Sequence, residues 1–434
     1  MGIFAPLMPG TVARGAVGEA SAEDYRLLAS QTDADLRRDV LSKWFPAAVD
    51  KEGDGFFENF AGDWTRSGEN GHRSIVYQSR LTWLAGEAAS YDVERAAEYL
   101  KITREGIDFL AGKQWDQKFG GFFWSVDAAG NRTNDRPDEK HTYGISFGIY
   151  ASASSHRVTG DAASLELAER AFNWLDGHAH DAQHGGYFEA LSRDGTPLPA
   201  MDGRDAIGTP YGEKSMNTHI HLLEALQELY GVWPEPIVRA RLEEVFEIVS
   251  DKIYTEPGYL TMYFEPDWKA VPGRDSYGHD VETAYLLVEA AARLGKPDDA
   301  RTWLIARRLV DHALKFGFDQ EHGGFYNEGS PAGGDAAKEK IWWVQAEGLN
   351  ALLLMHERFG GETPVYWQCF QQQWAFISKF QIDHEHGGWY PTVNADGTPR
   401  IALPKSDRWT EGYHQGRALM NVTERLRRLA GEEK

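Results

Sequence analysis

The chain has 434 residues, and its 66 acidic side chains outnumber its 45 basic ones, which gives a formal net charge of −21. Such a surface repels the phosphates of nucleic acids and of anionic lipids, so we expect neither a nucleic acid nor a membrane as partner. With a single cysteine, Cys369, the chain offers no intrachain disulfide. This favours a reducing compartment and predicts the cytoplasm. A small neutral molecule is the expected ligand.

One short phrase recurs along the chain: one or two glycines followed by aromatic residues. It stands at 54–57, 120–123, 185–188, 323–326 and 387–390, with a degenerate copy at 258–260. Recurrence at a nearly fixed period indicates a repeat architecture. The glycines permit the positive φ of a tight turn, and we expect the aromatic residues to begin a short strand. Turn residues at 127–131 and 394–397 predict the tips of β-hairpins.

Amphipathic stretches between these turns predict twelve helices, two in each repeat. They lie near 28–46, 73–90, 94–113, 140–157, 161–178, 213–230, 234–253, 278–294, 297–316, 340–359, 363–380 and 410–430. The second helix of each pair is the more apolar one, which favours a ring of six inner helices inside six outer ones. We therefore predict an all-α fold, a closed (α/α)6 barrel with short hairpins at one rim, over an open solenoid. Residues 1–20 are expected to be a loose extension, and 21–434 a single domain.

Unusual polar and aromatic residues recur in the first turns of the predicted inner helices, which the topology gathers at one rim. They are Arg80, Tyr143, Asn217, His219, His279, Glu282, Trp342, Trp343, Glu347, Trp409 and His414. This recurrence predicts a polar pocket at the mouth of the barrel. His219 and His221 point to different faces of one helix, so only one of them can reach that pocket. Glu282 and Glu347, on apolar helices, need partners, for which Arg80 and His279 are candidates.

Other histidines have a simpler interpretation. His184, His322 and His386 precede glycine pairs at equivalent repeat positions, which indicates a structural role. His178, His180 and His184 have the composition of a metal site, but two of them are turn residues. The chain contains no phosphate-binding glycine loop, dinucleotide fingerprint or serine nucleophile elbow. We therefore expect no cofactor and no catalytic metal.

Four segments resemble the N-acylglucosamine 2-epimerase superfamily, in particular its cellobiose 2-epimerase branch. They are residues 217–225, 276–283, 342–347 and 413–418. The resemblance implies an (α/α)6 barrel, no cofactor and a proton-transfer mechanism. It also implies roles: His279 and His414 as the acid/base pair, His219 for ring opening or charge stabilisation, and Arg80 for the enediolate oxygen. By the same resemblance Tyr143, Asn217, Trp343, Glu347 and Trp409 would hold the sugar, and Glu282 would orient a catalytic group.

Inverting C2 of an aldose requires removal and return of a proton beside a carbonyl, for which two imidazoles are suited. The expected activity is therefore a sugar 2-epimerase on glucose- or mannose-configured neutral sugars. Departures from the branch at 409–414 and 284–285 leave a free monosaccharide as favoured as a disaccharide. The alternatives are an aldose–ketose isomerase, an inverting glycosidase using Asp280 and Glu347, and a non-catalytic sugar-binding barrel. We expect a monomer or weak homodimer.

Overall fold

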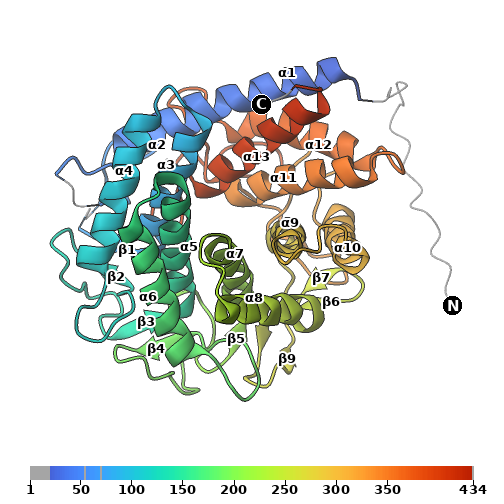
Figure 1. Ribbon diagram of the computed structural model, residues 1–434. Helices are drawn as coiled ribbons and strands as arrows, with labels where there is room; N and C mark the ends of the chain where they lie inside the picture. Colours follow the sequence, from blue (N-terminus) through green and yellow to red (C-terminus); the bar gives the residue numbers. More distant parts are fainter. Residues whose placement is uncertain (1–19, 53–54, 69–70, 433–434) are drawn as a thin grey trace.

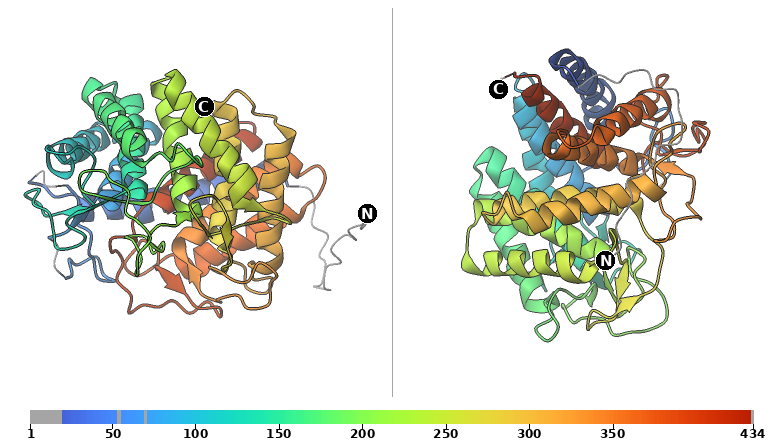
Figure 2. Two further views of the ribbon diagram at one scale, coloured as in Figure 1. Left: turned by 90° about the horizontal axis from the view of Figure 1, so that it is seen from below. Right: turned by 90° about the vertical axis from the view of Figure 1, so that its right-hand side faces the viewer.

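The computed structural model describes residues 20–52, 55–68 and 71–432. Apart from residue 20, the N-terminal extension expected at 1–20 lies outside the described residues. Within them the chain forms two concentric layers of helices with short strands at one end (Figure 1, Figure 2).

The inner layer is a closed ring of six helices among the described residues. Each helix contacts the next in chain order, and the last contacts the first, which excludes the open solenoid. The six are α3 (Ile75–Tyr91), α5 (Thr142–Thr159), α7 (Met216–Val232), α9 (Tyr277–Arg293), α11 (Trp342–Phe359) and α13 (Tyr413–Leu429). Nearly every residue in their first three turns is buried, because these helices pack against both neighbours and the outer layer.

The outer layer covers the ring, each outer helix packing mainly against one inner helix. It comprises α1 (Ala22–Asp35), α4 (Ala96–Phe109), α6 (Ala162–Ala179), α8 (Pro236–Ile248), α10 (Ala300–Phe316) and α12 (Val365–Phe376). A π-helical segment, η1 (Leu36–Leu41), joins α1 to α2 (Ser42–Ala48). Similar segments, η2 (Leu110–Gln114), η3 (Val249–Ile253) and η4 (Ile377–Gln381), end α4, α8 and α12. The predicted all-α (α/α)6 barrel is confirmed.

The first outer helix begins at Ala22, six residues before the predicted start near 28. The reason is a capping box: the Ser21 side chain accepts from the Asp24 backbone N–H, and the Asp24 carboxylate accepts from the Ser21 N–H. These reciprocal bonds satisfy backbone donors that a helix start otherwise leaves free.

The strands pair between successive repeats. A strand that leads into an inner helix pairs with a strand in the following loop, always antiparallel. The pairs are β1 (Arg73–Ser74) with β2 (Ser125–Val126), β3 (Glu139–His141) with β4 (Ala190–Ser192), β5 (Lys214–Ser215) with β8 (Tyr263–Phe264), and β10 (Lys340–Ile341) with β11 (Thr392–Val393). β8 also pairs with β9 (Ala270–Val271), and β6 (Tyr254–Thr255) pairs with β7 (Tyr259–Leu260).

The expectation that the aromatic residues after each glycine pair begin a strand is wrong for most repeats. Phe122, Tyr187, Phe325 and Trp389 each form only a single bridge to the residue that follows an outer helix. Both glycines of each pair have positive φ, which reverses the chain at once and leaves room for one bridging pair. Only the degenerate fourth copy, Tyr259–Leu260, forms a strand there.

A buried lysine–aspartate pair recurs at these turns and ties four of the inner helices, α5, α7, α11 and α13, to the glycine turn before each. Lys214 Nζ lies 2.7 Å from Asp181, Lys340 Nζ 2.7 Å from Asp319, and Lys405 Nζ 2.7 Å from Asp383; Lys140 pairs with Asp116 at 3.2 Å. The same aspartates accept from the backbone N–H groups of His184, His322 and His386. The structural interpretation of these three histidines therefore agrees with their positions.

No helix within the described ranges is both long enough and apolar enough to cross a lipid bilayer.

Candidate active site

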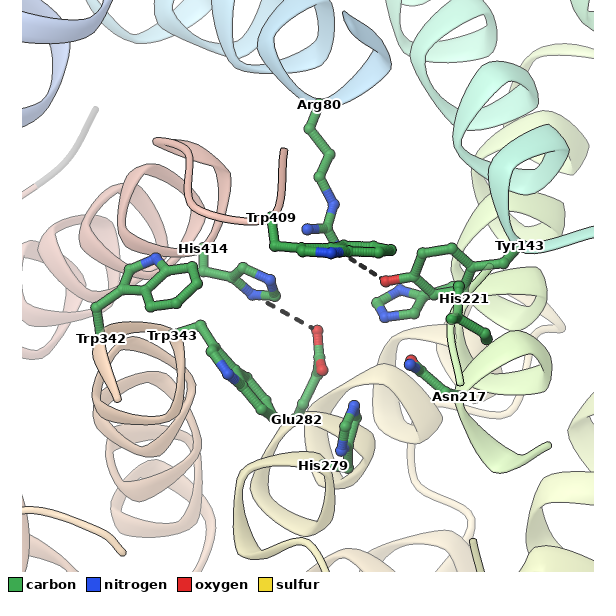
Figure 3. Close-up of a pocket in the computed structure, with 11 residues that line it drawn as sticks. Arg80, Tyr143, Asn217, His221, His279, Glu282, Trp342, Trp343, Trp409 and His414 are labelled. Carbon is green, nitrogen blue, oxygen red and sulfur yellow. Dashed lines mark hydrogen bonds and ion pairs between the residues drawn. The ribbon is translucent and has the colours of Figure 1, made fainter. Parts of the chain in front are cut away.

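A cavity of about 210 Å³ lies where the first turns of the inner helices converge (Figure 3). Eleven residues line it: Arg80, Tyr143, Ile207, Asn217, His221, His279, Glu282, Trp342, Trp343, Trp409 and His414. The chain positions of these residues span almost the whole barrel, so the cavity exists only because the ring closes. Nine of the eleven residues that the sequence placed at this rim are in the lining, and His219 and Glu347 are not.

Most of the residues that line the cavity occupy equivalent positions in the inner helices. The second residue of α5, α7, α11 and α13 faces the cavity, and so does the sixth residue of α3, α7 and α9. Residues four apart lie one above the other on a helix face, so both positions look inward together. The second positions are Tyr143, Asn217, Trp343 and His414, and the sixth positions are Arg80, His221 and Glu282.

His219 occupies the fourth position of α7, which faces away from the cavity; its placement in the pocket was wrong. Its Nε2 accepts from the Tyr187 N–H at 3.1 Å, and its Nδ1 bonds the Ser215 carbonyl at 2.7 Å. The ring packs edge-on against Trp268, and burial lowers its pKa to about 3. His219 therefore holds a glycine–aromatic turn.

The fourth residue of other inner helices also accepts a hydrogen bond from the backbone of a turn. Gln78 accepts from the Phe56 N–H at 2.7 Å, and Gln345 accepts from the Phe325 N–H at 2.8 Å. Asp280 accepts from the Leu260 N–H at 3.1 Å. Comparison of the repeats position by position would have assigned His219 to this structural set from sequence alone.

His221 takes the place in the cavity that was expected of His219. Its Nδ1 lies 3.0 Å from Glu224 Oε2, and its ring packs against Tyr143 and Phe147. Although burial acts to raise it, the pKa of Glu224 is lowered to about 2 by Arg417 and by the bond to His221. Glu224 therefore remains an ionised partner for His221.

A matched pair of substitutions tests this assignment. His219→Gln is expected to leave kcat/KM and Tm close to wild type, because Gln78 and Gln345 already perform its task. His221→Gln should lower kcat at least ~10-fold, since a positioned imidazole is worth about 10²–10⁴-fold in proton-transfer chemistry. Steady-state kinetics and thermal melts check both. A larger kinetic loss for His219→Gln than for His221→Gln would reverse the assignment.

Glu347 lies behind His414 rather than in the lining. Its Oε1 is 2.6 Å from His414 Nδ1 and 2.8 Å from Arg417 Nη2. A carboxylate at Nδ1 holds a proton on that nitrogen and leaves Nε2 as the acceptor. The expected direct contact of Glu347 with a sugar is therefore replaced by a contact that orients His414.

Arg417 connects the buried carboxylates under the cavity, and sequence reasoning missed it. Its Nη2 donates to Glu282 at 2.6 Å as well as to Glu347, and its Nη1 donates to Glu224. Glu282 thus pairs with Arg417 and lies 3.9 Å from His414 Nδ1 (Figure 3), and neither expected partner, Arg80 or His279, bonds it. Burial raises the pKa of Glu347 above its usual value, and Arg417 opposes that rise.

Ring contacts with Trp343 position the remaining two histidines. The Trp343 ring is tilted against both His279 and His414, with ring centroids 4.8 and 5.6 Å away. His279 Nδ1 is 2.6 Å from the Ser276 hydroxyl. Burial lowers the pKa of His279 to about 4 and that of His414 well below its ordinary value. Both rings are therefore neutral near pH 7.

Arg80 crosses from the opposite wall of the cavity. Its Nη1 donates to Glu411 at 2.7 Å, and its Nη2 donates to the Tyr143 hydroxyl at 3.1 Å (Figure 3). Its Nε and Asn217 Oδ1 are buried with no hydrogen-bond partner in the described chain. Unpaired buried polar atoms beside a cavity are suited to a polar ligand.

Two other sets of residues considered from the sequence, a glycosidase carboxylate pair and a histidine metal site, do not come together in the structure. Asp280 supports a turn and Glu347 supports His414, so the carboxylate pair of an inverting glycosidase does not flank the cavity. His178, His180 and His184 bond separate partners, namely the Trp174 carbonyl, Glu244 and Asp181.

A double-layered helical barrel with three histidines and one carboxylate lining the cavity at its mouth has the groups that acid–base chemistry requires. Comparison with known proteins agrees. The family model for N-acylglucosamine 2-epimerase matches residues 55–418, so the chain belongs to that family. It is an enzyme of the isomerase and epimerase class.

Individual relatives are similar over almost their whole length. Cellobiose 2-epimerase of Bacteroides fragilis is 29% identical over 397 residues, covering 91% of this chain and 98% of that protein. D-Mannose isomerase of Marinomonas mediterranea is 25% identical over 404 residues, covering 89% and 96%. The solved structure of cellobiose 2-epimerase from Spirochaeta thermophila superimposes with a TM-score of 0.81 at 29% identity, covering 94% and 98%.

Proposed function

We propose that this enzyme interconverts glucose- and mannose-configured neutral aldoses by inverting C2. The single observation that carries the proposal is the placement of His279 and His414 in one cavity, both in contact with Trp343. Each ring is engaged through Nδ1, so Nε2 is the nitrogen left for a substrate.

The chemistry follows from these positions. The sugar ring opens to expose the C1 aldehyde, and the Nε2 of one imidazole takes the proton from C2, leaving an enediolate. The other imidazole, after taking up a solvent proton on Nε2, returns that proton to the opposite face of C2, and the first imidazole releases its proton to solvent. Ring closure then gives the epimer. His414 is the better placed base for one direction, because Glu347 and Glu282 stabilise its protonated form. Tautomerisation requires no further reactant.

The negative enediolate oxygen needs a fixed cationic donor. We assign this role to Arg80, whose guanidinium is buried and held by Glu411 and Tyr143. His221 assists on the same wall in place of His219. Asn217, Trp343 and Trp409 bind the sugar, while Glu347 and Glu282 orient His414.

The acid side of the pH profile is a direct consequence of burial. His279 and His414 act as bases only when neutral, and burial lowers both pKa values from the ordinary 6.5, that of His279 to about 4. As the pH falls, kcat/KM should therefore persist below pH 6.5 and decline only where the lowered pKa values are reached. Initial rates from pH 4 to 8 measure this. An acid limb centred at or above pH 6.5 would contradict it.

Product analysis tests the function itself. The enzyme is incubated with glucose, mannose or cellobiose, and products are identified by NMR. Formation of the C2 epimer from at least one of these sugars is the expected result. Release of glucose from cellobiose would indicate a glycosidase, and unchanged sugars with measurable binding would indicate a binding protein.

An aldose–ketose isomerase is the second candidate, favoured by the similarity to the D-mannose isomerase of Marinomonas mediterranea. Both reactions share the enediolate and differ in whether the proton returns to C2 or to C1. In D₂O a 2-epimerase labels C2 of the aldose, whereas an isomerase produces a ketose labelled at C1.

We propose a cytoplasmic enzyme, because its one cysteine, Cys369, is buried and free. A monomer or weak homodimer is proposed for its oligomeric state, which light scattering at increasing concentration measures.

A further inference from the structure

A second group of buried ligand-type side chains lies beside the active site but outside its cavity. Asp275 and Asp280 flank the start of α9, and His312 reaches them from the outer helix α10. His312 Nδ1 lies 3.3 Å from Asp275 Oδ2 and 3.5 Å from Asp280 Oδ2. The two carboxylates are fully buried, and His312 is only 5% exposed.

The hydrogen bonds fix which atoms face the centre of this group. His312 Nε2 lies 3.0 Å from the Pro331 carbonyl, which can only accept, so Nε2 carries a proton. In a neutral ring Nδ1 is then a lone pair. Asp280 uses Oδ1 for the Leu260 N–H. Asp280 Oδ2, both oxygens of Asp275 and His312 Nδ1 form no hydrogen bond of ordinary geometry within the described residues, and Asp275 and Asp280 lie close enough to share a proton.

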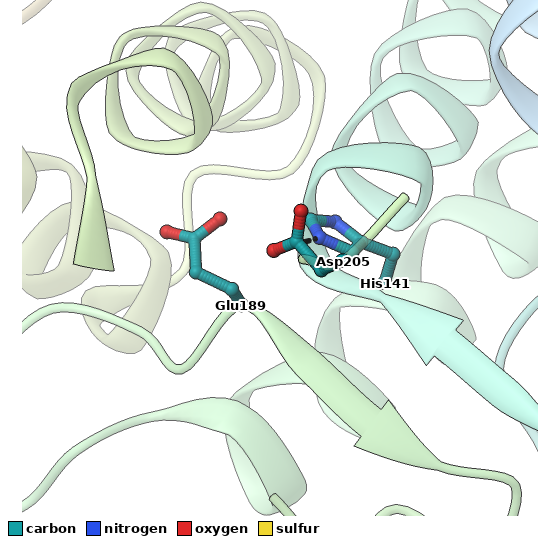
Figure 4. Close-up of side chains that lie close together, drawn as sticks. All are labelled: His141, Glu189 and Asp205. Carbon is teal, nitrogen blue, oxygen red and sulfur yellow. Dashed lines mark hydrogen bonds and ion pairs between the residues drawn. The ribbon is translucent and has the colours of Figure 1, made fainter. Parts of the chain in front are cut away.

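Two other groups of similar composition show what a satisfied cluster looks like. His141 Nε2 lies 2.9 Å from Asp205 Oδ2, while Asp205 Oδ1 accepts from the Ile207 and Thr209 N–H groups (Figure 4). Glu189, in the same cluster, accepts from the Ser215 N–H. The third group, Glu282, Glu347 and His414, already has Arg417 as its cation. Among these three groups, only the Asp275 group brings hydrogen-bond acceptors together without a backbone N–H or a cationic side chain to bind them.

We propose that Asp275, Asp280 and His312 bind a divalent cation, with Zn²⁺ as the best match to one imidazole and two carboxylates. A dication would neutralise the two buried carboxylates, which in its absence retain protons because burial raises their pKa values. The spacing agrees as well: bonds of about 2.0–2.1 Å in a tetrahedral zinc site put neighbouring ligand atoms about 3.4 Å apart. A charged hydrogen bond would instead bring them to about 2.7–2.9 Å.

The position of this group gives the cation a structural task. Asp275 and Asp280 enclose Ser276 and His279 in sequence, and His312 belongs to the neighbouring outer helix. A bound ion would therefore fasten the N-terminus of α9, which carries His279, to α10. This inference stands independently of the proposed sugar chemistry.

Zinc binding by the full chain tests the proposal. The protein is dialysed against a chelator, and Zn²⁺ alone is titrated in competition with a chromophoric chelator. Wild type is expected to bind one equivalent tightly and to gain several degrees in Tm. Asp275→Asn and His312→Gln should lose both effects, whereas Asp205→Asn, in the satisfied cluster, should keep them.

Equal zinc binding and equal Tm gain in wild type and Asp275→Asn would overturn the proposal, as would no tight equivalent in wild type. In either case Asp275, Asp280 and His312 would be held together by shared protons and not by a metal ion. If the variants fail to fold, zinc-edge X-ray absorption of loaded wild type decides. A first shell containing one imidazole and carboxylate oxygens at about 2.0–2.1 Å supports the site, and a fully hydrated ion refutes it.

Discussion

Replacing His279 or His414 with alanine is expected to lower the rate of C2 epimerisation by about 10²–10⁴-fold, the usual worth of a positioned general acid or base. Each variant retains one member of the acid/base pair, so it can exchange the C2 proton from only one face. The double variant should show no exchange with solvent deuterium at C2. The measurement is NMR of glucose and mannose after incubation in D₂O.

The control for these variants is His386→Ala. His386 lies in a glycine turn, half exposed and remote from the cavity lining, and it should retain wild-type rates. Thermal melts identify any variant that loses activity through unfolding. Deuterium exchange at wild-type rate in the double variant would remove both histidines from the mechanism.

Replacing Arg417 with methionine is expected to give the largest loss of stability, about 3–5 kcal/mol, because it leaves charged groups buried without their partner. Glu224, Glu282 and Glu347 all bond this guanidinium and are at most 1% exposed. Urea denaturation of wild type and variant measures the difference. Activity should fall as well, since His414 and His221 both depend on these carboxylates.

The pH dependence of this loss has a definite sign. In the variant, buried carboxylates without a cation have raised pKa values, so the folded state binds more protons than the unfolded state. Its stability therefore falls as pH rises. The deficit relative to wild type should shrink between pH 8 and pH 5. A deficit that grows over that interval would show that the three carboxylates do not depend on Arg417.

Arg428→Met, in the last turn of the same helix, is the matched control. Arg428 forms an exposed pair with Glu357 at 3.3 Å, and such pairs contribute about 0–1 kcal/mol. A similar loss in both variants would mean that removal of any arginine from α13 weakens the helix, irrespective of the buried network.

The electrostatic potential in the cavity is set by buried cationic and anionic side chains that contact one another. The guanidinium groups of Arg80 and Arg417 alternate with Glu411, Glu282 and Glu347, and burial keeps His279 and His414 neutral. Such an arrangement presents neutral acceptors to a proton and a fixed cation to a developing oxyanion.

Much of the fold of this protein follows from local patterns in its sequence. Helix period, glycine turns and their recurrence were enough for twelve helices in six pairs and for the closed barrel. The first turns of the inner helices were correctly expected to supply the pocket, because chain direction alone brings those ends to one rim. The helices could be predicted because the apolar residues of an amphipathic helix recur at the helical period within a short stretch of sequence.

The tertiary structure decided which face of each helix looks inward. His219 and His221 are two residues apart, and the structure shows that His219 accepts from the Tyr187 N–H while His221 lines the cavity. Arg417, Glu411 and Glu224 act through partners that are far away in sequence and lie on other inner helices or next to them. Such pairings depend on helix rotation and on barrel closure, which no short segment encodes by itself.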